Sequence, residues 1–139
     1  MYDFYGKESV GDNVRGLYSD LLNCWCRETC AAGMRDDWSE ENPTLGQCSI
    51  TSFLVQDIMG GRVFGIPLPS GGFHCYNVVG GVRFDLTSEQ FGKKAAELDY
   101  TDRYEQSREV HFADADKKRR YELLKQLYAE YRKNGKRDE

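Results

Sequence analysis

The 139-residue sequence predicts an α+β fold in which a helix that begins at a cysteine packs on a small antiparallel sheet. Three observations predict it: an apolar helical pattern starts at Cys48, two β-rich runs flank a glycine pair, and amphipathic patterns lie near both ends. A chain of this length can bury most of its unfolded surface in one core, so we expect one domain over residues 1–139. Its expected parts are a core at about 42–92 and terminal helices at about 12–30 and 115–133.

Charge and hydropathy exclude several classes of partner. A net charge of -4 and a pI near 5.3 argue against a nucleic-acid surface, which needs a clustered cationic face. No stretch approaches the ~20 apolar residues that cross a bilayer, and no signal-peptide pattern opens the chain, so we expect a cytoplasmic protein without a membrane partner. An odd count of five cysteines in a reducing compartment favours free thiols.

The first element expected is an amphipathic helix from about Asp12 to Cys30. Apolar residues recur there at spacings of three and four, which places them on one helical face. They are Val14, Leu17, Tyr18, Leu21, Leu22 and Trp25. Gly33, an acidic stretch and Pro43 then interrupt the pattern and predict a loop that leads to Cys48.

The second element expected is a central helix over Cys48–Met59. Its apolar residues occupy more than a narrow stripe, as in a helix that is covered on several sides. Gly60-Gly61 provides a C-terminal stop, and the run Arg62–Ile66 then reads as a strand that ends at a proline.

A β-hairpin is expected next. Two β-rich runs, Phe73–Val79 and Val82–Leu86, are separated by Gly80-Gly81. This dipeptide tolerates the positive φ angles of a two-residue hairpin turn, so the two runs should pair as antiparallel neighbours.

The register of this hairpin predicts a contact between a histidine and a carboxylate. With the glycine pair as the turn, Val79 faces Val82 and Tyr76 faces Asp85. His74 then lies one diagonal step from Asp85 on the same face of the sheet, within reach of a hydrogen bond.

The remaining elements rest on weaker patterns. Thr87–Phe91 resembles a capped helical turn, and Ser107–Phe112 reads as a further strand in which His111 is an ordinary member. Asp114 or Asp116 can cap the C-terminal helix, whose basic residues are interleaved with acidic ones and therefore predict a solvated face. Its apolar face is formed by Tyr121, Leu124, Leu127, Tyr128 and Tyr131.

The residue types at the centre of the chain fit nucleophilic catalysis. A helix N-terminus and a nearby imidazolium both stabilise a thiolate, so Cys48 is the candidate nucleophile and His74 its base. Asp85 would hold the imidazole in the useful tautomer. The Cys48 amide and the Gln47 side chain are candidate oxyanion donors, and Trp38 could line a groove that leads to the thiol.

The order of Gly46-Gln47-Cys48, His74 and Asp85 resembles the transglutaminase-like and papain-like cysteine superfamily. More closely, several stretches are similar to the YunG-like family of uncharacterised bacterial proteins. They are Asn42–Cys48, Gln56-Asp57, Gly60-Gly61, His74 with Asn77, and Asp85–Phe91. The superfamily resemblance implies a papain-like or transglutaminase-like core and acyl transfer through a thioester, by hydrolysis or transfer at a peptide, isopeptide or small amide substrate.

Two other functions remain open from the sequence. The chain could be a noncatalytic module on the same fold that binds a protein through its acidic loop and its tyrosines. Alternatively, cysteines of the first helix could form a zinc site with His74 or Cys75, but their spacing lacks a second knuckle, so the leading interpretation has no metal and no cofactor. The cysteines in question are Cys24, Cys26 and Cys30.

Overall fold

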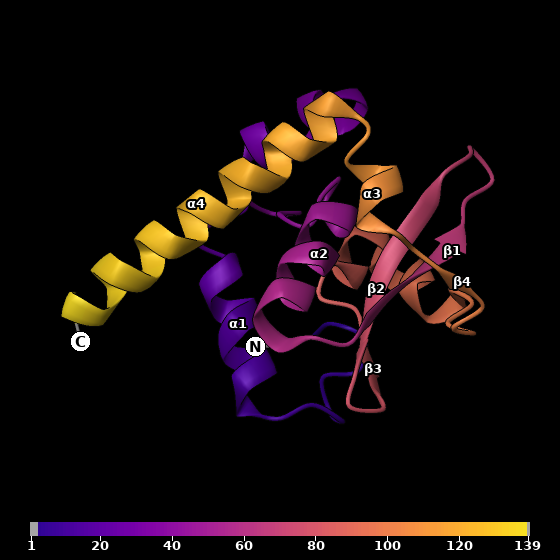
Figure 1. Ribbon diagram of the computed structural model, residues 1–139, viewed down its shortest axis with the longest axis horizontal. Helices are drawn as coiled ribbons and strands as arrows, with labels where there is room; N and C mark the ends of the chain where they lie inside the picture. The colour runs from indigo at the N-terminus through magenta and orange to yellow at the C-terminus, as the bar shows by residue number, and fades with distance from the viewer. Residues whose placement is uncertain (1–2, 139) are drawn as a thin grey trace.

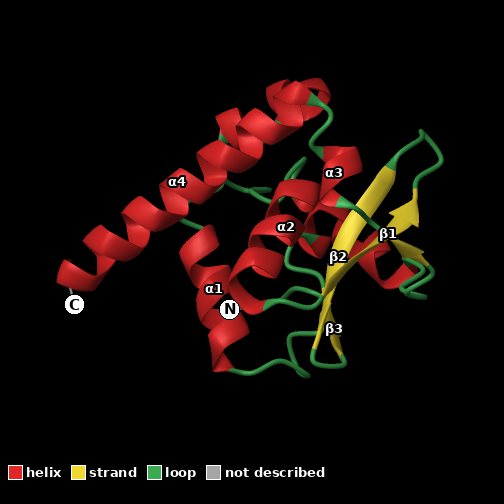
Figure 2. Cartoon of the chain, in the orientation of Figure 1, coloured by secondary structure: helices red, strands yellow, loops and turns green. Residues whose placement is uncertain are grey.

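A four-stranded antiparallel sheet forms one side of the computed structural model, which describes residues 3–138. The strand order is β3-β2-β1-β4, and the helices α1, α2 and α4 gather on one side of this sheet (Figures 1 and 2). The strands are β1 (Arg62–Pro67), β2 (Phe73–Val79), β3 (Val82–Phe84) and β4 (Tyr104–Glu105). A mixed α+β architecture with a small antiparallel sheet, as the sequence predicts, is therefore confirmed.

The helix α2 (Cys48–Met59) has the predicted bounds and lies between the sheet and α4 (Figure 1). Its first two turns are buried on almost every side, in agreement with the broad apolar pattern. The helix ends at Gly60, whose φ of +78° is in the region that glycine adopts without a steric penalty.

The first helix is shorter than predicted, because α1 (Asp12–Leu21) stops well before Cys30. Past its end the amide of Cys24 bonds to the carbonyl of Leu21, and Cys26 is fully extended. The segment continues as two 3₁₀ helices, η1 (Arg27–Thr29) and η2 (Ala32–Asp37). Burial explains the misleading pattern at Trp25, which faces the core without being helical, whereas Leu22 of the predicted apolar face is exposed.

The hairpin of β2 and β3 has the predicted glycine turn, and Val79 pairs with Val82. The predicted strand to Leu86 is wrong at its end, because β3 stops at Phe84. Asp85 instead forms an isolated antiparallel bridge with Tyr5, whose carbonyl accepts the Asp85 amide at 2.9 Å. The described backbone pairing of Asp85 is thus with the N-terminal segment rather than with β2.

The predicted strand over Ser107–Phe112 is wrong. The Ser107 hydroxyl accepts the amide of Glu109 and caps a short helix, α3 (Arg108–His111), because a serine oxygen satisfies an amide that a helix start leaves unpaired. The strand of this region, β4, lies just before it and pairs with β1.

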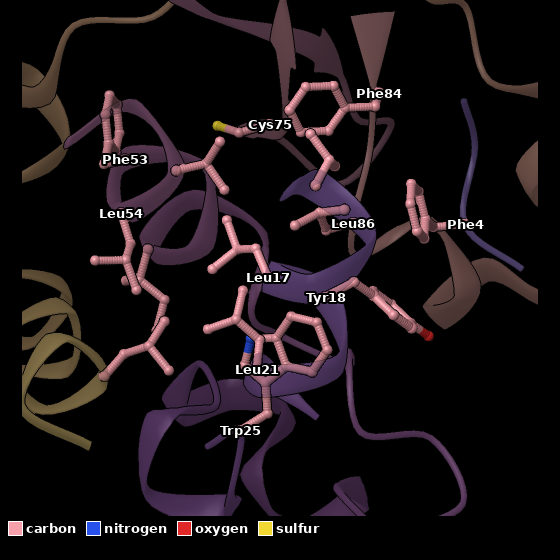
Figure 3. Packing of buried hydrophobic residues seen from close by; sticks show 14 of the residues in the cluster. Phe4, Leu17, Tyr18, Leu21, Trp25, Phe53, Leu54, Cys75, Phe84 and Leu86 are labelled. Atoms are coloured by element: carbon pink, nitrogen blue, oxygen red, sulfur yellow. The ribbon is translucent and has the colours of Figure 1, made fainter. Parts of the chain in front are cut away.

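The C-terminal helix α4 (Ala115–Asp138) crosses α1 and α2, and Asp114 caps it by accepting the Lys117 amide at 3.0 Å. Between β3 and β4 the 3₁₀ segment η3 (Ser88–Glu97) contains the predicted helical turn and is interrupted at Gly92. Figure 3 shows the core into which α1, α2 and the sheet direct their apolar side chains. Throughout the described chain, every helix is too short or too polar to cross a membrane.

Candidate active site

Three secondary-structure elements bring the predicted trio together. Cys48 is the first residue of α2, His74 is the second residue of β2, and Asp85 directly follows β3. Nε2 of His74 lies 2.5 Å from Oδ2 of Asp85, and both side chains are buried. The predicted contact between His74 and Asp85 is therefore confirmed, although β3 ends at Phe84 and not at Leu86.

The Asp85 carboxylate is held at both oxygens. Oδ1 accepts hydrogen bonds from the amide and the hydroxyl of Thr87, at 3.1 and 3.3 Å. Oδ2 accepts a hydrogen bond of 2.7 Å from the hydroxyl of Tyr100 and faces His74. A buried carboxyl group needs such partners, and this network fixes its orientation.

The His74 ring is positioned for two partners. Nε2 is directed to Asp85, while Nδ1 is buried without a hydrogen bond of standard geometry to the described residues. The Cys48 thiol interacts with the ring, and Nδ1 is the nitrogen that remains for it. Phe91 contacts the ring edge-on, with centroids 4.7 Å apart, and restricts its rotation.

Electrostatics favour a charged pair. A hydrogen bond from the Cys75 thiol lowers the pKa of Cys48 well below its ordinary value; burial opposes this, and the His74 ring and the Cys75 amide support it. Burial disfavours the imidazolium of His74, but the Asp85 carboxylate and the Cys48 thiol outweigh it and raise the His74 pKa to about 10. A thiolate and an imidazolium can therefore coexist at neutral pH.

Cys75 is a further thiol in direct contact with the candidate nucleophile. It is fully buried and belongs to the core cluster that also contains Phe53 and Phe84 (Figure 3). Its hydrogen bond to the Cys48 sulfur, together with burial, holds the pKa of Cys75 well above the ordinary value. Cys75 is therefore placed as a neutral hydrogen-bond donor to the Cys48 sulfur.

A cavity of about 180 Å³ opens beside Cys48, which is partly exposed. Apolar side chains form much of its wall, and Lys117 of α4 also lines it. Larger hollows of about 530 and 550 Å³ lie elsewhere, but neither is lined by a cysteine or a histidine. Of these three cavities, the one of about 180 Å³ is therefore the candidate active site, because Cys48 and His74 line it.

Gln47 and Trp38 are placed differently from their predicted roles. Nε2 of Gln47 donates to the carbonyl of Cys26 at 3.1 Å, and the side chain is fully buried. One N–H of this amide is therefore engaged away from Cys48, and the buried side chain does not line the described cavity. Trp38 donates its indole N–H to the carbonyl of Pro43 at 3.0 Å and is absent from the described lining of the cavity.

The remaining cysteines do not gather with other ligands. Cys24 bonds to the carbonyl of Asp20, and Cys30 is buried against the loop that contains Gly46. Within the described part of the chain, no three His, Cys, Asp or Glu side chains are placed to hold a metal ion. This arrangement gives the zinc alternative no support.

Sequence reasoning missed Tyr100 and Lys117, and assigned His111 to a strand without a partner. His111 instead lies in α3 and interacts with Gln106, Lys117 and, at 4.0 Å, the sulfur of Cys75. Nothing local marks Tyr100 or Lys117, because each reaches the site through tertiary packing. Of the site residues that were missed, only Cys75 could have been found from the sequence, because it directly follows the candidate histidine His74.

Comparison with known proteins identifies relatives by sequence. A protein-family model described as "YunG protein" matches residues 13–133. A protein of Bacillus subtilis (strain 168), described as "Uncharacterized protein YunG", is 35% identical over 111 residues, which cover 80% of this chain and 87% of the relative. No solved structure matches the chain.

Proposed function

The chain belongs to the YunG family, and we propose that it acts through Cys48 as a cysteine-dependent hydrolase or acyl transferase on an amide, peptide or isopeptide bond. The observation that carries this proposal is the line of contacts from the Cys48 thiol through the His74 ring to the buried Asp85 carboxylate. A nucleophile, a base and a group that orients the base are the parts that such chemistry requires.

The proposed reaction has two steps. The Cys48 thiolate attacks the substrate carbonyl carbon, and the oxyanion is stabilised by first-turn amides of α2, which have no partners within the helix. When the C–N bond breaks, the His74 imidazolium gives its proton to the leaving amine, and a thioester on Cys48 remains. His74 then takes a proton from water, or from an acceptor amine, as that nucleophile attacks the thioester and releases the thiolate.

This arrangement also supports the finer proposal of a papain-like or transglutaminase-like core. In both, a cysteine that opens a helix faces a histidine on a strand of an antiparallel sheet, with an orienting side chain on the next strand. The chain has Cys48, His74 and Asp85 in the same order along the sequence, with Asp85 directly after the strand β3. We expect a cytoplasmic setting, in which the thiols stay reduced.

Thiol labelling tests the proposal without a known substrate. The rate of iodoacetamide labelling is measured across about pH 5 to 9 and assigned to each cysteine by mass spectrometry. Cys48 should be labelled selectively well below pH 8, and His74→Ala should remove this reactivity by destroying the ion pair. Cys26, which has no described contact with His74, serves as the internal reference in each sample.

The alternative of a noncatalytic protein-binding module predicts the opposite result. A sealed or separated trio would leave Cys48 as slow as an ordinary buried thiol, with no response to His74→Ala. Such labelling would reject the catalytic proposal, provided that thermal unfolding shows the variant to be folded. The adjacency of the three side chains and the partial exposure of Cys48 support catalysis over this alternative.

A further inference from the structure

Lys117 is a cation in the wall of the candidate active site. It lies in the first turn of α4 and lines the same cavity as Cys48 and His74. The side chain is partly buried, and no ion pair joins it to an Asp or Glu in the described chain. A partly buried charge without a counter-ion is costly unless it has a function or other partners.

His111 holds this cation in place. Nζ of Lys117 lies 2.9 Å from Nδ1 of His111, and Nε2 of the same ring lies 2.8 Å from Oε1 of Gln106. One neutral tautomer satisfies both contacts, since Nδ1 accepts from the ammonium and Nε2 donates to the amide oxygen. Burial, and then the charge of Lys117, lower the pKa of His111 and so favour this neutral form.

Apart from the Cys48 thiolate, which is paired with the His74 imidazolium, the described cavity wall offers no anion to balance Lys117. None of the described residues that line the cavity is acidic. Arg120 also lines it, but this guanidinium is buried, donates to Asp116 at 2.9 Å and to the carbonyl of Thr29 at 3.2 Å, and so has its own counter-charge. Phe73 and Phe91 provide apolar surface, which strengthens the field of an unpaired cation.

We propose that Lys117 makes the site selective for substrates that carry a carboxylate close to the scissile carbonyl. The inference rests on the proposed function and names the substrate class of that site, such as an acidic peptide residue or a small N-acyl amino acid. A cavity of about 180 Å³ is below the range of about 300 to 1,000 Å³ of sites for drug-sized ligands. It therefore fits one small acidic group rather than an extended ligand.

Two alkylating reagents of nearly equal size test this inference. Iodoacetate carries a carboxylate beside its reactive carbon, whereas iodoacetamide carries a neutral amide. The measured quantity is the rate of Cys48 labelling by iodoacetate divided by the rate with iodoacetamide, for the full chain at neutral pH and low salt. Dividing the two rates removes changes in thiolate population, which affect both reagents alike.

Lys117→Gln should lower this ratio by about threefold to tenfold, because an attractive charge near the thiolate is lost. Lys117→Arg should keep the ratio near that of the wild type, and added salt should reduce it in the wild type. Lys118→Gln is the matched control, since it removes one cation from the adjacent, exposed position. Equal ratios for Lys117→Gln and Lys118→Gln would overturn the inference.

The outcomes separate this inference from the proposed function. If iodoacetamide labels Cys48 selectively at low pH but Lys117→Gln leaves the rate ratio unchanged, only the proposed preference for a carboxylate is rejected. If Cys48 shows no activated labelling by either reagent, the proposed catalytic function fails first. Thermal unfolding of each variant shows whether it is folded. Lys117→Arg is a second test of the inference, because it keeps the positive charge and should therefore keep the rate ratio.

Discussion

Tyr100 donates its hydroxyl hydrogen to the same carboxylate oxygen of Asp85 that faces His74, at 2.7 Å. This tyrosine follows η3 in the sequence, and its ring stacks on that of Tyr5, with centroids 3.8 Å apart. Tyr5 in turn bridges Asp85 through the backbone. The orienting carboxylate is therefore fixed by the N-terminal segment and by a loop, and not by the hairpin alone.

Tyr100→Phe should destabilise the protein by about 1 to 3 kcal/mol, because a buried carboxylate loses one of its donors. Urea denaturation of the variant and the wild type measures the difference. Tyr104→Phe is the control, since that exposed side chain has no described hydrogen bond, and it should change stability by less than about 0.5 kcal/mol. Equal effects of the two substitutions would show that the bond to Asp85 contributes nothing.

Asp85→Asn should weaken the activation of Cys48. The charge that raises the His74 pKa is removed while the shape is kept, so less imidazolium is present to stabilise the thiolate. The rate of iodoacetamide labelling near pH 6 should fall about tenfold or more, since one unit of pKa changes the thiolate population tenfold at low pH. Unchanged labelling would mean that Asp85 has no electrostatic role at the site.

The Cys48 and His74 pair predicts an unusual dependence of stability on pH. In the unfolded chain the His74 imidazole titrates at about pH 6.5 and the Cys48 thiol at about pH 8.5. In the folded protein the thiol pKa is lowered and the His74 pKa is raised to about 10. Between about pH 6.5 and 8.5 both states bind one proton on the pair, so its contribution to the unfolding free energy is constant.

Cys48→Ala should remove this plateau. His74 alone keeps a pKa raised by Asp85, so its stabilisation is complete below about pH 6.5 and is lost as pH rises toward the folded value. We expect the unfolding free energy of the variant, relative to the wild type, to fall by up to about 1.4 kcal/mol per pH unit above pH 6.5. Urea denaturation at several pH values measures this slope, and parallel curves for the two proteins would contradict the ion pair.

Gly46→Ala should destabilise the loop before the nucleophile. Gly46 has a φ of +70°, and an added Cβ would lie 2.6 Å from the sulfur of Cys30 and 2.9 Å from the amide nitrogen of Ala31. Backbone strain and overpacking together should cost about 2 to 4 kcal/mol. Gly33→Ala, where an added Cβ meets nothing within 4 Å, is the control and should change stability by less than about 1 kcal/mol.

Local patterns in the sequence predicted the elements that position the trio. The bounds of α2 and of β2, and the glycine turn after β2, follow from apolar runs and from residues with few conformational choices. The contact between His74 and Asp85 follows from the register that this turn sets. These features depend on neighbours in the sequence, so a single sequence is enough to predict them.

Features that depend on tertiary packing were not predicted. Trp25 continued the helical spacing of α1, but its burial comes from a contact in the core, where its indole donates to Thr51. The residues that flank Tyr100 and Lys117 in the sequence are mostly polar, as in any solvent-exposed segment. Their roles appear only when η3 and α4 are packed against the sheet and α2.

The position of α4 beside the cavity has a consequence for biosynthesis. The ribosome releases Cys48 and His74 long before Lys117, so a nascent chain carries the thiol without the wall that faces it. The cavity beside Cys48 is therefore complete only after α4 has been synthesised and has packed against α2.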